Sequence, residues 1–310
     1  MLRIATTQLY QQAAKTMGDR QTALFKVQQQ MATGNRLLTN SDDPVGSARM
    51  LGLNEELGRY DQYQRNTGLA NSRLNVEETT LEGVGQTLQN VRELIVQANN
   101  APLNDSDRRD IAQQIRQFHA QLVGLANTQD GNGEYLFAGF QSHTQPFTVD
   151  ANNLVSYQGD QGQRLIKVGP GLDVPVSDSG FEVFQNVPAG NQDLFTTLNK
   201  LATALETGTG TPAQLTQFND AMATGLSELD QGLDHLTGIR AKIGGRMNAL
   251  DDQQNTNGDF AVHLKQTIGD IGDLDYAEAA TRLSRETLVL QAAQQSFVKI
   301  QGLSLFNYMR

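Results

Sequence analysis

Apolar residues recur every seven positions at both ends of this chain. Such a spacing predicts long helices that pair as a coiled coil, although one further helix of a globular bundle would show it as well. Most of the residues in between are Gln, Thr, Ala and Lys at the start of the chain, so the apolar stripe there is narrow. The members of the two stripes are Tyr10, Met17, Leu24, Met31 and Leu38 at the start, and Tyr276, Leu283, Leu290 and Phe297 at the end.

Further helices are expected in the first half of the chain. Asp43 can cap a helix that has Pro44 at its first position, where the missing N–H of proline costs nothing. From 71 to 98, apolar residues recur at spacings of three and four, which predicts a long amphipathic helix. The same pattern between 107 and 127 predicts another helix.

The chain between 140 and 190 has a different pattern. Short runs such as "PFTV", "LVSYQGD" and "LDVPV" are separated by Gly and Pro, which predicts a region made mainly of strands. Two glycine-rich stretches, "VGPGLD" and "ETGTGTP", lack the strand–loop–helix context of a phosphate-binding loop, so we expect them to be linkers. The segment "DGNGE" is expected to be a turn before a strand.

Helix resumes after this region. Thr211 and Gln214 can form a capping box, and apolar residues then continue without a breaker to Leu250, which predicts a helix of about forty residues. The fold is therefore expected to be mainly α, with a small β domain inserted between helical halves and the two chain ends alongside each other. We expect terminal coiled-coil segments at 1–40 and 275–310, a composite helical domain from 41–139 and 191–274, and a β-rich domain at 140–190.

Composition narrows the functional classes. The 310 residues include no Cys, which excludes disulfides, thiolate metal sites and thiol nucleophiles. The net charge of −10 is uneven, because both ends are basic and the middle is strongly acidic, so repulsion would oppose binding of nucleic acid. No stretch approaches the roughly 18 apolar residues of a membrane span, and the start lacks the apolar core of a secretory signal. These rules alone predict a soluble cytoplasmic protein.

Candidate catalytic and metal-binding chemistry is sparse. The four histidines, His119, His143, His235 and His263, have no second ligand at metal spacing and no nucleophile motif nearby, so we expect them on helix surfaces or in loops. The acidic segment "DIGDLDYAE" lacks the ligand spacing of an EF-hand and is expected to be a solvated face. An enzyme acting on carbohydrate would need two converging carboxylates, which no spacing supports. We therefore expect no catalytic residue, no cofactor and no metal.

Several motifs occur in a fixed order along the chain. They are "SDDP", "DGNGEYLFAGF" followed by "TQPF", and the closing "SLFNY". In these motifs the chain resembles the flagellin-like family of the bacterial flagellum, and within it the hook-associated protein 3 group, which joins the hook to the filament. Flagellin shares the first motif but does not usually show the other two. The resemblance covers residues 1–147 and 273–310.

This resemblance implies an elongated, flagellin-like rod without enzymatic activity. It also implies export through the flagellar type III channel without a cleaved signal peptide. The implied location is then extracellular, at the hook–filament junction, and not the cytoplasm. The implied partners are further copies of the chain in a ring, the hook-side junction protein (hook-associated protein 1), flagellin, and a cytoplasmic export chaperone that holds the C-terminal segment. Nucleic acid and membrane are not among them.

We expect the two ends to pack against other subunits. Burial of the few side chains in the two stripes contributes roughly 1.5–3 kcal/mol each. Ordering costs about 1–2 kcal/mol of backbone entropy for every residue of both segments, which is more in total. Loose order of the two ends is therefore expected in the monomer. Alternatives are flagellin itself, or a soluble helical binding or secreted module with an intramolecular coiled coil. The residues expected to pack are Leu9, Tyr10, Met17, Leu24, Val27 and Met31 in the first segment, and Leu283, Leu290, Phe297, Ile300, Leu303 and Phe306 in the last.

Overall fold

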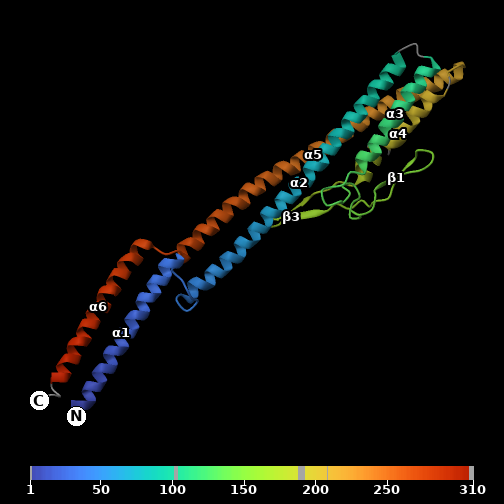
Figure 1. The fold of residues 1–310 in the computed structure, drawn as a ribbon. Helices are drawn as coiled ribbons and strands as arrows, with labels where there is room; N and C mark the ends of the chain where they lie inside the picture. Colours follow the sequence, from blue (N-terminus) through green and yellow to red (C-terminus); the bar gives the residue numbers. More distant parts are fainter. Residues whose placement is uncertain (1, 101–103, 188–192, 208, 307–310) are drawn as a thin grey trace. The chain divides into compact units, whose positions relative to one another are not determined.

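The computed structural model describes residues 2–100, 104–187, 193–207 and 209–306. Figure 1 shows its elements along the chain. In order they are α1 (Leu2–Thr33), α2 (Pro44–Asn100), α3 (Asp105–Ala126), β1 (Phe147–Val149), β2 (Val155–Tyr157), β3 (Leu165–Gly169), β4 (Leu172–Pro175), the π-helical turn η1 (Phe181–Gln185), α4 (Leu194–Glu206), α5 (Pro212–Gly272) and α6 (Tyr276–Phe306). Across these described ranges, none of the helices has the length and apolar character that crossing a membrane requires.

The chain divides into two compact units. Unit 1 comprises residues 1–59 and 259–310, and unit 2 comprises residues 60–258. Helices α2 and α5 therefore contribute residues to both units. The mainly helical fold with a small β region is the one that the sequence predicts, whereas the three-part domain boundaries given above stay a prediction.

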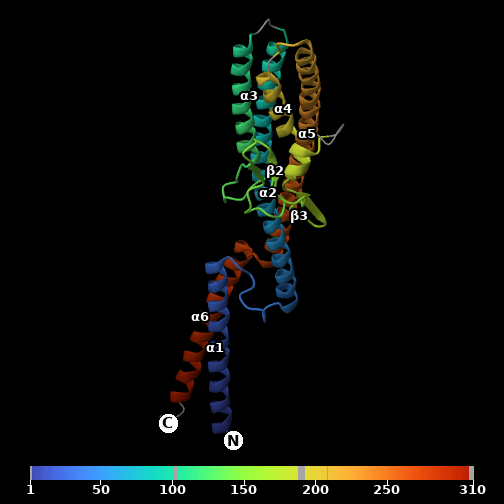
Figure 2. The ribbon, with the colours of Figure 1, turned by 90° about the vertical axis from the view of Figure 1, so that its right-hand side faces the viewer.

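Unit 2 is a helix bundle with a β region at its side. Figure 2 shows the unit 2 parts of α2 and α5 beside α3 and α4. Arg92 pairs with Asp230 at 2.6 Å and Glu78 pairs with Arg240 at 2.6 Å, so α2 and α5 run antiparallel. Buried apolar side chains from all four helices form one core, for example Leu81, Leu122, Leu198 and Leu236. The three-and-four spacing along each helix places these residues on the inward face.

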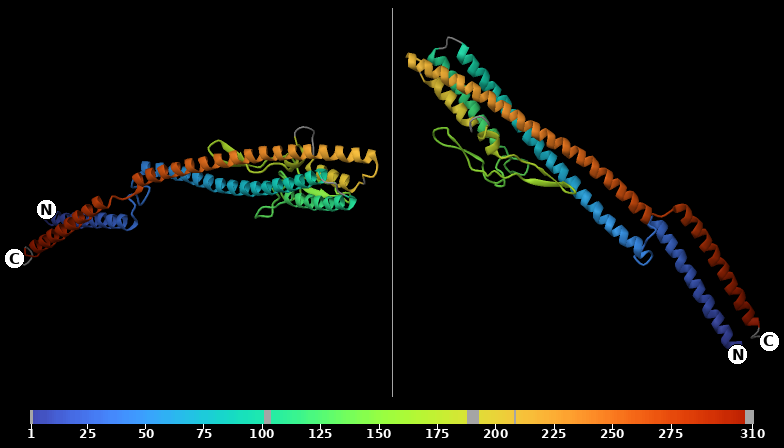
Figure 3. Two further views of the ribbon diagram at one scale, coloured as in Figure 1. Left: turned by 90° about the horizontal axis from the view of Figure 1, so that it is seen from above. Right: turned by 180° about the vertical axis from the view of Figure 1, so that it is seen from behind.

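The β region consists of two antiparallel hairpins, β1–β2 and β3–β4, which form separate sheets. Side-chain amides of the long helices hold the second hairpin. The Asn66 amide of α2 donates to the Lys167 carbonyl at 2.6 Å, and the Asn257 amide of α5 donates to the Val168 carbonyl at 2.8 Å. Figure 3 shows the hairpins from two further sides. The β region is thus fastened to two helices of its own unit.

An aromatic cluster joins the β region to helix α4. Phe137, Phe147, Phe184 and Phe195 are all among the fully buried side chains. The Phe147 ring centroid lies 5.1 Å from that of Phe195, which is in the first turn of α4, and 5.4 Å from that of Phe184 in η1. Such inclined ring pairs add to the free energy of burial. A single apolar core therefore spans the hairpins and the bundle.

Two predicted helix starts are confirmed. Helix α2 begins at Pro44, and α5 begins at Pro212 with the expected capping box. The Gln214 N–H donates to Thr211 Oγ1 at 3.2 Å, while the Thr211 N–H donates to Gln214 Oε1 at 3.1 Å. Both helices are longer than expected: the stretch 71–98 belongs to the helix that begins at Pro44, and α5 has 61 residues. Isolated glycines within a helix do not stop it when its flanking turns are packed.

Other local predictions were wrong. Between 140 and 187 the chain is mostly loop, with four short strands and the turn η1, because the Asp150 and Asp160 side chains accept backbone N–H groups that a strand ladder would otherwise pair. The stretch "VGPGLD" is no linker but the tight turn between β3 and β4, where Gly171 has φ +76° and supplies the left-handed conformation that glycine favours. Helix α4 was not predicted, and the Asp193 side chain caps it by accepting from the Phe195 N–H at 2.9 Å.

One histidine prediction also fails. His119 is buried on α3, where its ring lies edge-on to Phe195 with centroids 6.1 Å apart. Burial, and to a lesser extent the nearby Arg116 charge, lowers the pKa of His119. The side chain is therefore a neutral core residue. His143 and His263 are exposed, as expected, and His235 Nε2 lies 2.8 Å from the Glu182 carbonyl oxygen.

Candidate functional site: the paired terminal helices

Helices α1 and α6 of unit 1 lie side by side and antiparallel (Figure 1). Tyr10 and Phe297 meet edge to face with ring centroids 6.0 Å apart. At the other end of the pair, the Tyr276 hydroxyl donates to the Met31 carbonyl at 3.3 Å. The seven-residue pattern predicted this pairing of the first and last segments, and the contacts confirm it.

Most of the residues expected to pack against other subunits lie in this intrachain seam. Val27 is buried, and seven others are half-buried: Tyr10, Met17, Leu24, Met31, Leu283, Leu290 and Phe297. Leu9, Ile300, Leu303 and Phe306 lie on α1 and α6, but their side chains fall outside the described residues. Leu38 follows the end of α1 and so is not part of the helical stripe. A role of these residues between subunits stays a prediction, as does loose order of the ends in the free monomer.

A second set of apolar side chains on the same helices points away from the seam. Phe25 on α1 is 67% exposed, and Leu288 and Val298 on α6 are 67% and 64% exposed. Phe25 follows Leu24, and Val298 follows Phe297, and a helix turns by about 100° from one residue to the next. Sequence reasoning missed these residues because it followed the helix face that the seven-residue repeat defines. For Phe25 and Val298 the available signal was an apolar residue directly beside a repeat position, whereas Leu288 stands two positions before Leu290.

Unit 1 has almost no apolar core of its own. Among its described residues, the buried apolar side chains are Val27, Ala261 and Ala279. Gln30 and Glu286 are buried as well, although both are polar. Besides those named above, its exposed large apolar side chains are Val45, Leu51, Phe260, Val262 and Tyr276. This unit therefore presents to solvent much of the apolar surface that it carries.

The buried Gln30 and Glu286 side chains of unit 1 each make a polar contact, although Gln30 Oε1 is buried without a hydrogen-bond partner. Arg20 on α1 reaches Glu286 on α6 at 3.4 Å, which places an ion pair across the helical pair. The Gln30 amide donates to the Arg36 carbonyl at 2.5 Å. The Arg20–Glu286 pair favours one register of the two helices, since a shift of one turn would leave the buried Glu286 carboxylate without this partner.

The segment after α1 is tied to the connection between α5 and α6. The Arg36 N–H donates to the Gly272 carbonyl at 2.7 Å, and the Leu274 N–H donates to the Gly34 carbonyl at 2.9 Å. The Arg36 guanidinium also donates to the Ile271 carbonyl at 2.6 Å, a favourable place for a cation at the C-terminal end of a helix. These hydrogen bonds join residues 34–36, which follow α1, to residues 271–274, which precede α6. We call this junction the base of unit 1.

A hollow of about 510 Å³ lies next to this base, between residues 37–40 and the first turns of α2. Leucine, proline and methionine side chains form much of its wall, including Leu37, Pro44, Met50 and Leu51. Thr39, Asn40, Ser47 and Asn54 also line this hollow, so its wall is of mixed character.

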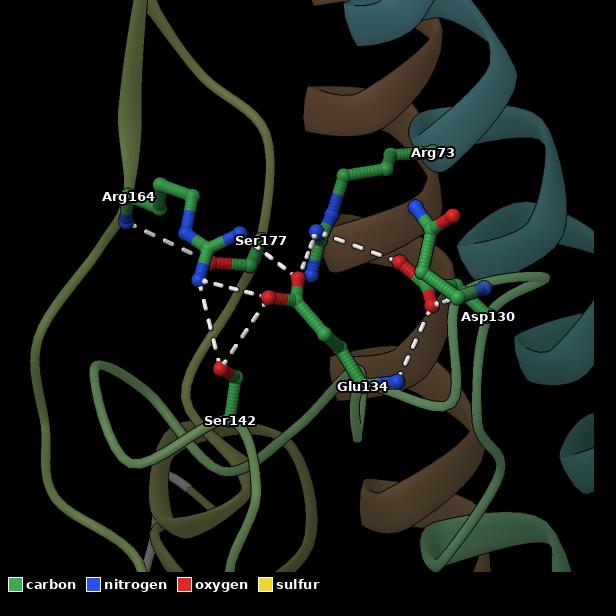
Figure 4. Close-up of polar contacts among 7 residues, drawn as sticks. Arg73, Asp130, Glu134, Ser142, Arg164 and Ser177 are labelled. Atoms are coloured by element: carbon green, nitrogen blue, oxygen red, sulfur yellow. Dashed lines mark hydrogen bonds and ion pairs between the residues drawn. The ribbon is translucent and has the colours of Figure 1, made fainter.

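A charged network in unit 2 fastens the β region to helix α2 (Figure 4). The Glu134 carboxylate lies between two arginines, 2.7 Å from Arg73 Nη1 and 2.7 Å from Arg164 Nη1. Arg73 also contacts the Asp130 carboxylate at 3.2 Å. Hydrogen bonds and charge from Arg164 and Arg73 lower the pKa of Glu134 to about 2. The segment "DGNGE" forms the expected turn, yet its acidic residues also anchor the region, which sequence reasoning missed.

The geometry of this network suits structural support. Arg73 comes from α2, Glu134 from the loop after α3, and Arg164 from the residue before β3, so three segments meet at one carboxylate. The described part of the chain contains no group of three His, Asp or Glu side chains that could hold a metal ion.

Two family models match the chain. The bacterial flagellin N-terminal helical region matches residues 4–142, and the bacterial flagellin C-terminal helical region matches residues 226–309. These matches include α2, α6, nearly all of α1, and α5 from residue 226 onwards. The chain belongs to the bacterial flagellin family.

Within this family, two relatives that match the chain from end to end share one name. The chain is 29% identical to flagellar hook-associated protein 3 of Escherichia coli (strain K12) over 322 residues, which covers 99% of each chain. It is 27% identical to flagellar hook-associated protein 3 of Salmonella typhimurium over 320 residues, with all of both chains covered. Among solved structures, a putative flagellar hook-associated protein from Vibrio parahaemolyticus has the same fold, with a TM-score of 0.68 and 23% identity over 75% of this chain and 100% of that one.

Proposed function

We propose that this chain is a structural, non-enzymatic component of the bacterial flagellum that joins the hook to the flagellin filament. Two relatives that match it from end to end are both flagellar hook-associated protein 3. The flagellin models cover α1 and α6, and both of these helices expose large apolar side chains. The family relationship and the exposed apolar residues of α1 and α6 thus favour the same conclusion, that the protein functions by binding other subunits of the flagellum.

The observation that carries this proposal is the composition of unit 1. Its described residues bury Val27, Ala261 and Ala279 as apolar core, while Phe25, Leu288 and other large apolar side chains remain exposed. Exposed apolar area is the main source of free energy for protein association. A chain with an intramolecular coiled coil and no assembly partner would instead be expected to have polar outer faces on these helices.

The proposed partners follow from this role. They are other copies of the chain in a ring, the hook-side junction protein (hook-associated protein 1) and flagellin. We further propose that a cytoplasmic export chaperone binds the C-terminal segment, and that the protein leaves the cell by the flagellar type III route without a cleaved signal peptide. Its place would then be extracellular, at the hook–filament junction.

Deletion and complementation in the source bacterium tests the junction role. Cells without the gene are expected to keep the hook but to release flagellin into the medium, because the filament has no attachment. Restoring the wild-type gene should restore attached filaments and swimming. Normal filaments in the deleted strain would refute the proposal.

Flagellin itself is the second candidate function, since both flagellin models match the chain. The same strains distinguish the two functions. If this chain were the flagellin, its deletion would leave no filament protein in the medium, and the filaments of the complemented strain would consist of this chain along their length. Immunogold labelling confined to one band next to the hook would favour the junction.

A further inference from the structure

Glu77 is a carboxyl group buried where helix α2 meets the β region. Only 1% of the surface of Glu77 is exposed to solvent. One carboxyl oxygen, Oε1, accepts the backbone N–H of Asp178 at 3.0 Å, which links α2 to the segment between β4 and η1. The other oxygen, Oε2, is buried without a hydrogen-bond partner. Neither family membership nor the proposed assembly accounts for a titratable group in this position.

The charged groups around Glu77 are engaged with other partners. Arg73, one turn earlier on α2, pairs with Glu134 at 2.7 Å and with Asp130 at 3.2 Å. Arg246 from α5 grips the Asp178 carboxylate with two hydrogen bonds of 2.9 Å. Asp178 itself brings a negative charge close to Glu77. An ionised Glu77 would therefore lie out of water, with one oxygen unsolvated and a like charge beside it.

We propose that Glu77 is a proton-dependent fastening between helix α2 and the β region. The neutral side chain holds the Asp178 segment through Oε1. Loss of the proton would strengthen this single hydrogen bond, but it would also place a charge out of water beside Asp178, so the junction as a whole would be destabilised. Burial, and next to it the charge of Asp178, raises the pKa of Glu77 from 4.5 to about 8, which agrees with this arrangement. The folded protein thus retains a proton that the unfolded chain releases.

The stability of the fold depends on pH because the pKa of Glu77 differs between the folded and the unfolded state. Below pH 4.5 Glu77 is protonated in both the folded and the unfolded state, so it does not make the free energy of unfolding depend on pH. Between pH 4.5 and about 8 the folded state must keep a proton that the unfolded state has lost, so stability falls as the pH rises. Above that range Glu77 is ionised in both the folded and the unfolded state, and the free energy of unfolding falls no further on its account.

Urea unfolding of the full chain at pH 5, 6, 7 and 8 tests the fastening. Glu77→Gln keeps an acceptor for the Asp178 N–H but cannot ionise. We expect the unfolding constant of the wild type, divided by that of Glu77→Gln, to rise with pH by up to about tenfold per pH unit. Glu93→Gln, an exposed position on the same helix, serves as the matched control, and its ratio to the wild type should stay constant.

A ratio that does not change between pH 5 and 8 would overturn the proposal. A second measurement decides the question if Glu77→Gln does not fold. The side-chain carboxyl carbon of Glu77 can be followed by NMR in the wild-type protein labelled at glutamate, with Glu77→Asp used for assignment. Titration of that signal well above pH 6 supports the fastening, and titration near pH 4.5 refutes it.

Discussion

Replacing Phe25 and Leu288 together by glutamine tests whether the outer faces of the terminal helices drive assembly. Each side chain is 67% exposed, and neither lies in the seam that pairs α1 with α6. Glutamine is a good helix former and both sites face solvent, so the free energy of unfolding of the monomer should change by less than about 0.5 kcal/mol per site. The double variant therefore separates assembly from folding.

The expected effect on association follows from the exposed fraction. Full burial of a large apolar side chain contributes about 1.5–3 kcal/mol, and the two-thirds that remains exposed here corresponds to about 1–2 kcal/mol per residue. Loss of both residues should weaken each contact that buries them by about 2–4 kcal/mol. In terms of the association constant, this is roughly a 30- to 1,000-fold decrease.

Sedimentation velocity over a concentration series measures this change, and retention of filaments on complemented cells reports it in vivo. Leu165→Gln is the matched control, because Leu165 is 58% exposed but lies on β3 in unit 2. The control should associate like the wild type. Equal association of the double variant and the wild type would refute the reasoning, as would an equal loss in the control.

Three further predictions concern the seam, the core and the charged network. Leu290→Asp puts an unpaired charge into the α1–α6 seam; limited proteolysis should then cut the terminal helices first while unit 2 stays intact, and uniform digestion would contradict this. Phe147→Ala should cost about 3–5 kcal/mol in urea unfolding, whereas Val149→Ala on the same strand should cost far less. Since the pKa of Glu134 is lowered to about 2, its stabilisation is present above pH 4.5 and lost as the pH falls towards 2; Glu134→Gln should flatten that acid dependence, and an unchanged acid profile would count against it.

The sequence predicts those features that depend on residues close in the chain. The capping box of Thr211 and Gln214 needs only a four-residue segment, and it is present as expected. Proline at position 44 likewise fixes the start of α2 by its own geometry. The pairing of α1 with α6 extends over the whole chain, yet it was predictable because both ends repeat their apolar residues every seven positions.

Features that depend on tertiary packing were not predictable in this way. His119 and Glu77 each stand at three-and-four spacing between buried apolar residues, so the pattern puts both on inward faces of their helices. The groups that cover them, Phe195 of α4 and the Asp178 segment of the β region, are set by tertiary packing. The stretch that turns between β3 and β4 has the glycine-rich composition of a flexible linker, so its composition alone does not predict a hairpin. Phe25 and Leu288 were overlooked for a different reason, since a seven-residue repeat identifies one face of a helix and says nothing about a second.

The apolar residues of unit 1 divide between these two faces, and this division bears on how the chain would assemble under the proposed function. The seam takes up residues such as Met17 and Leu290 within one chain, while Phe25 and Leu288 are left on the outside. One outer residue contributes about 1–2 kcal/mol, which is about a tenfold gain in affinity and far too little to hold two subunits together. Several such residues engaged at once would add their contributions, so association should be weak for an isolated pair and strong for a subunit that meets several neighbours. Assembly built on such a surface would be cooperative, with little pairing in dilute solution and stable binding only where a ring or a filament end already presents more than one partner.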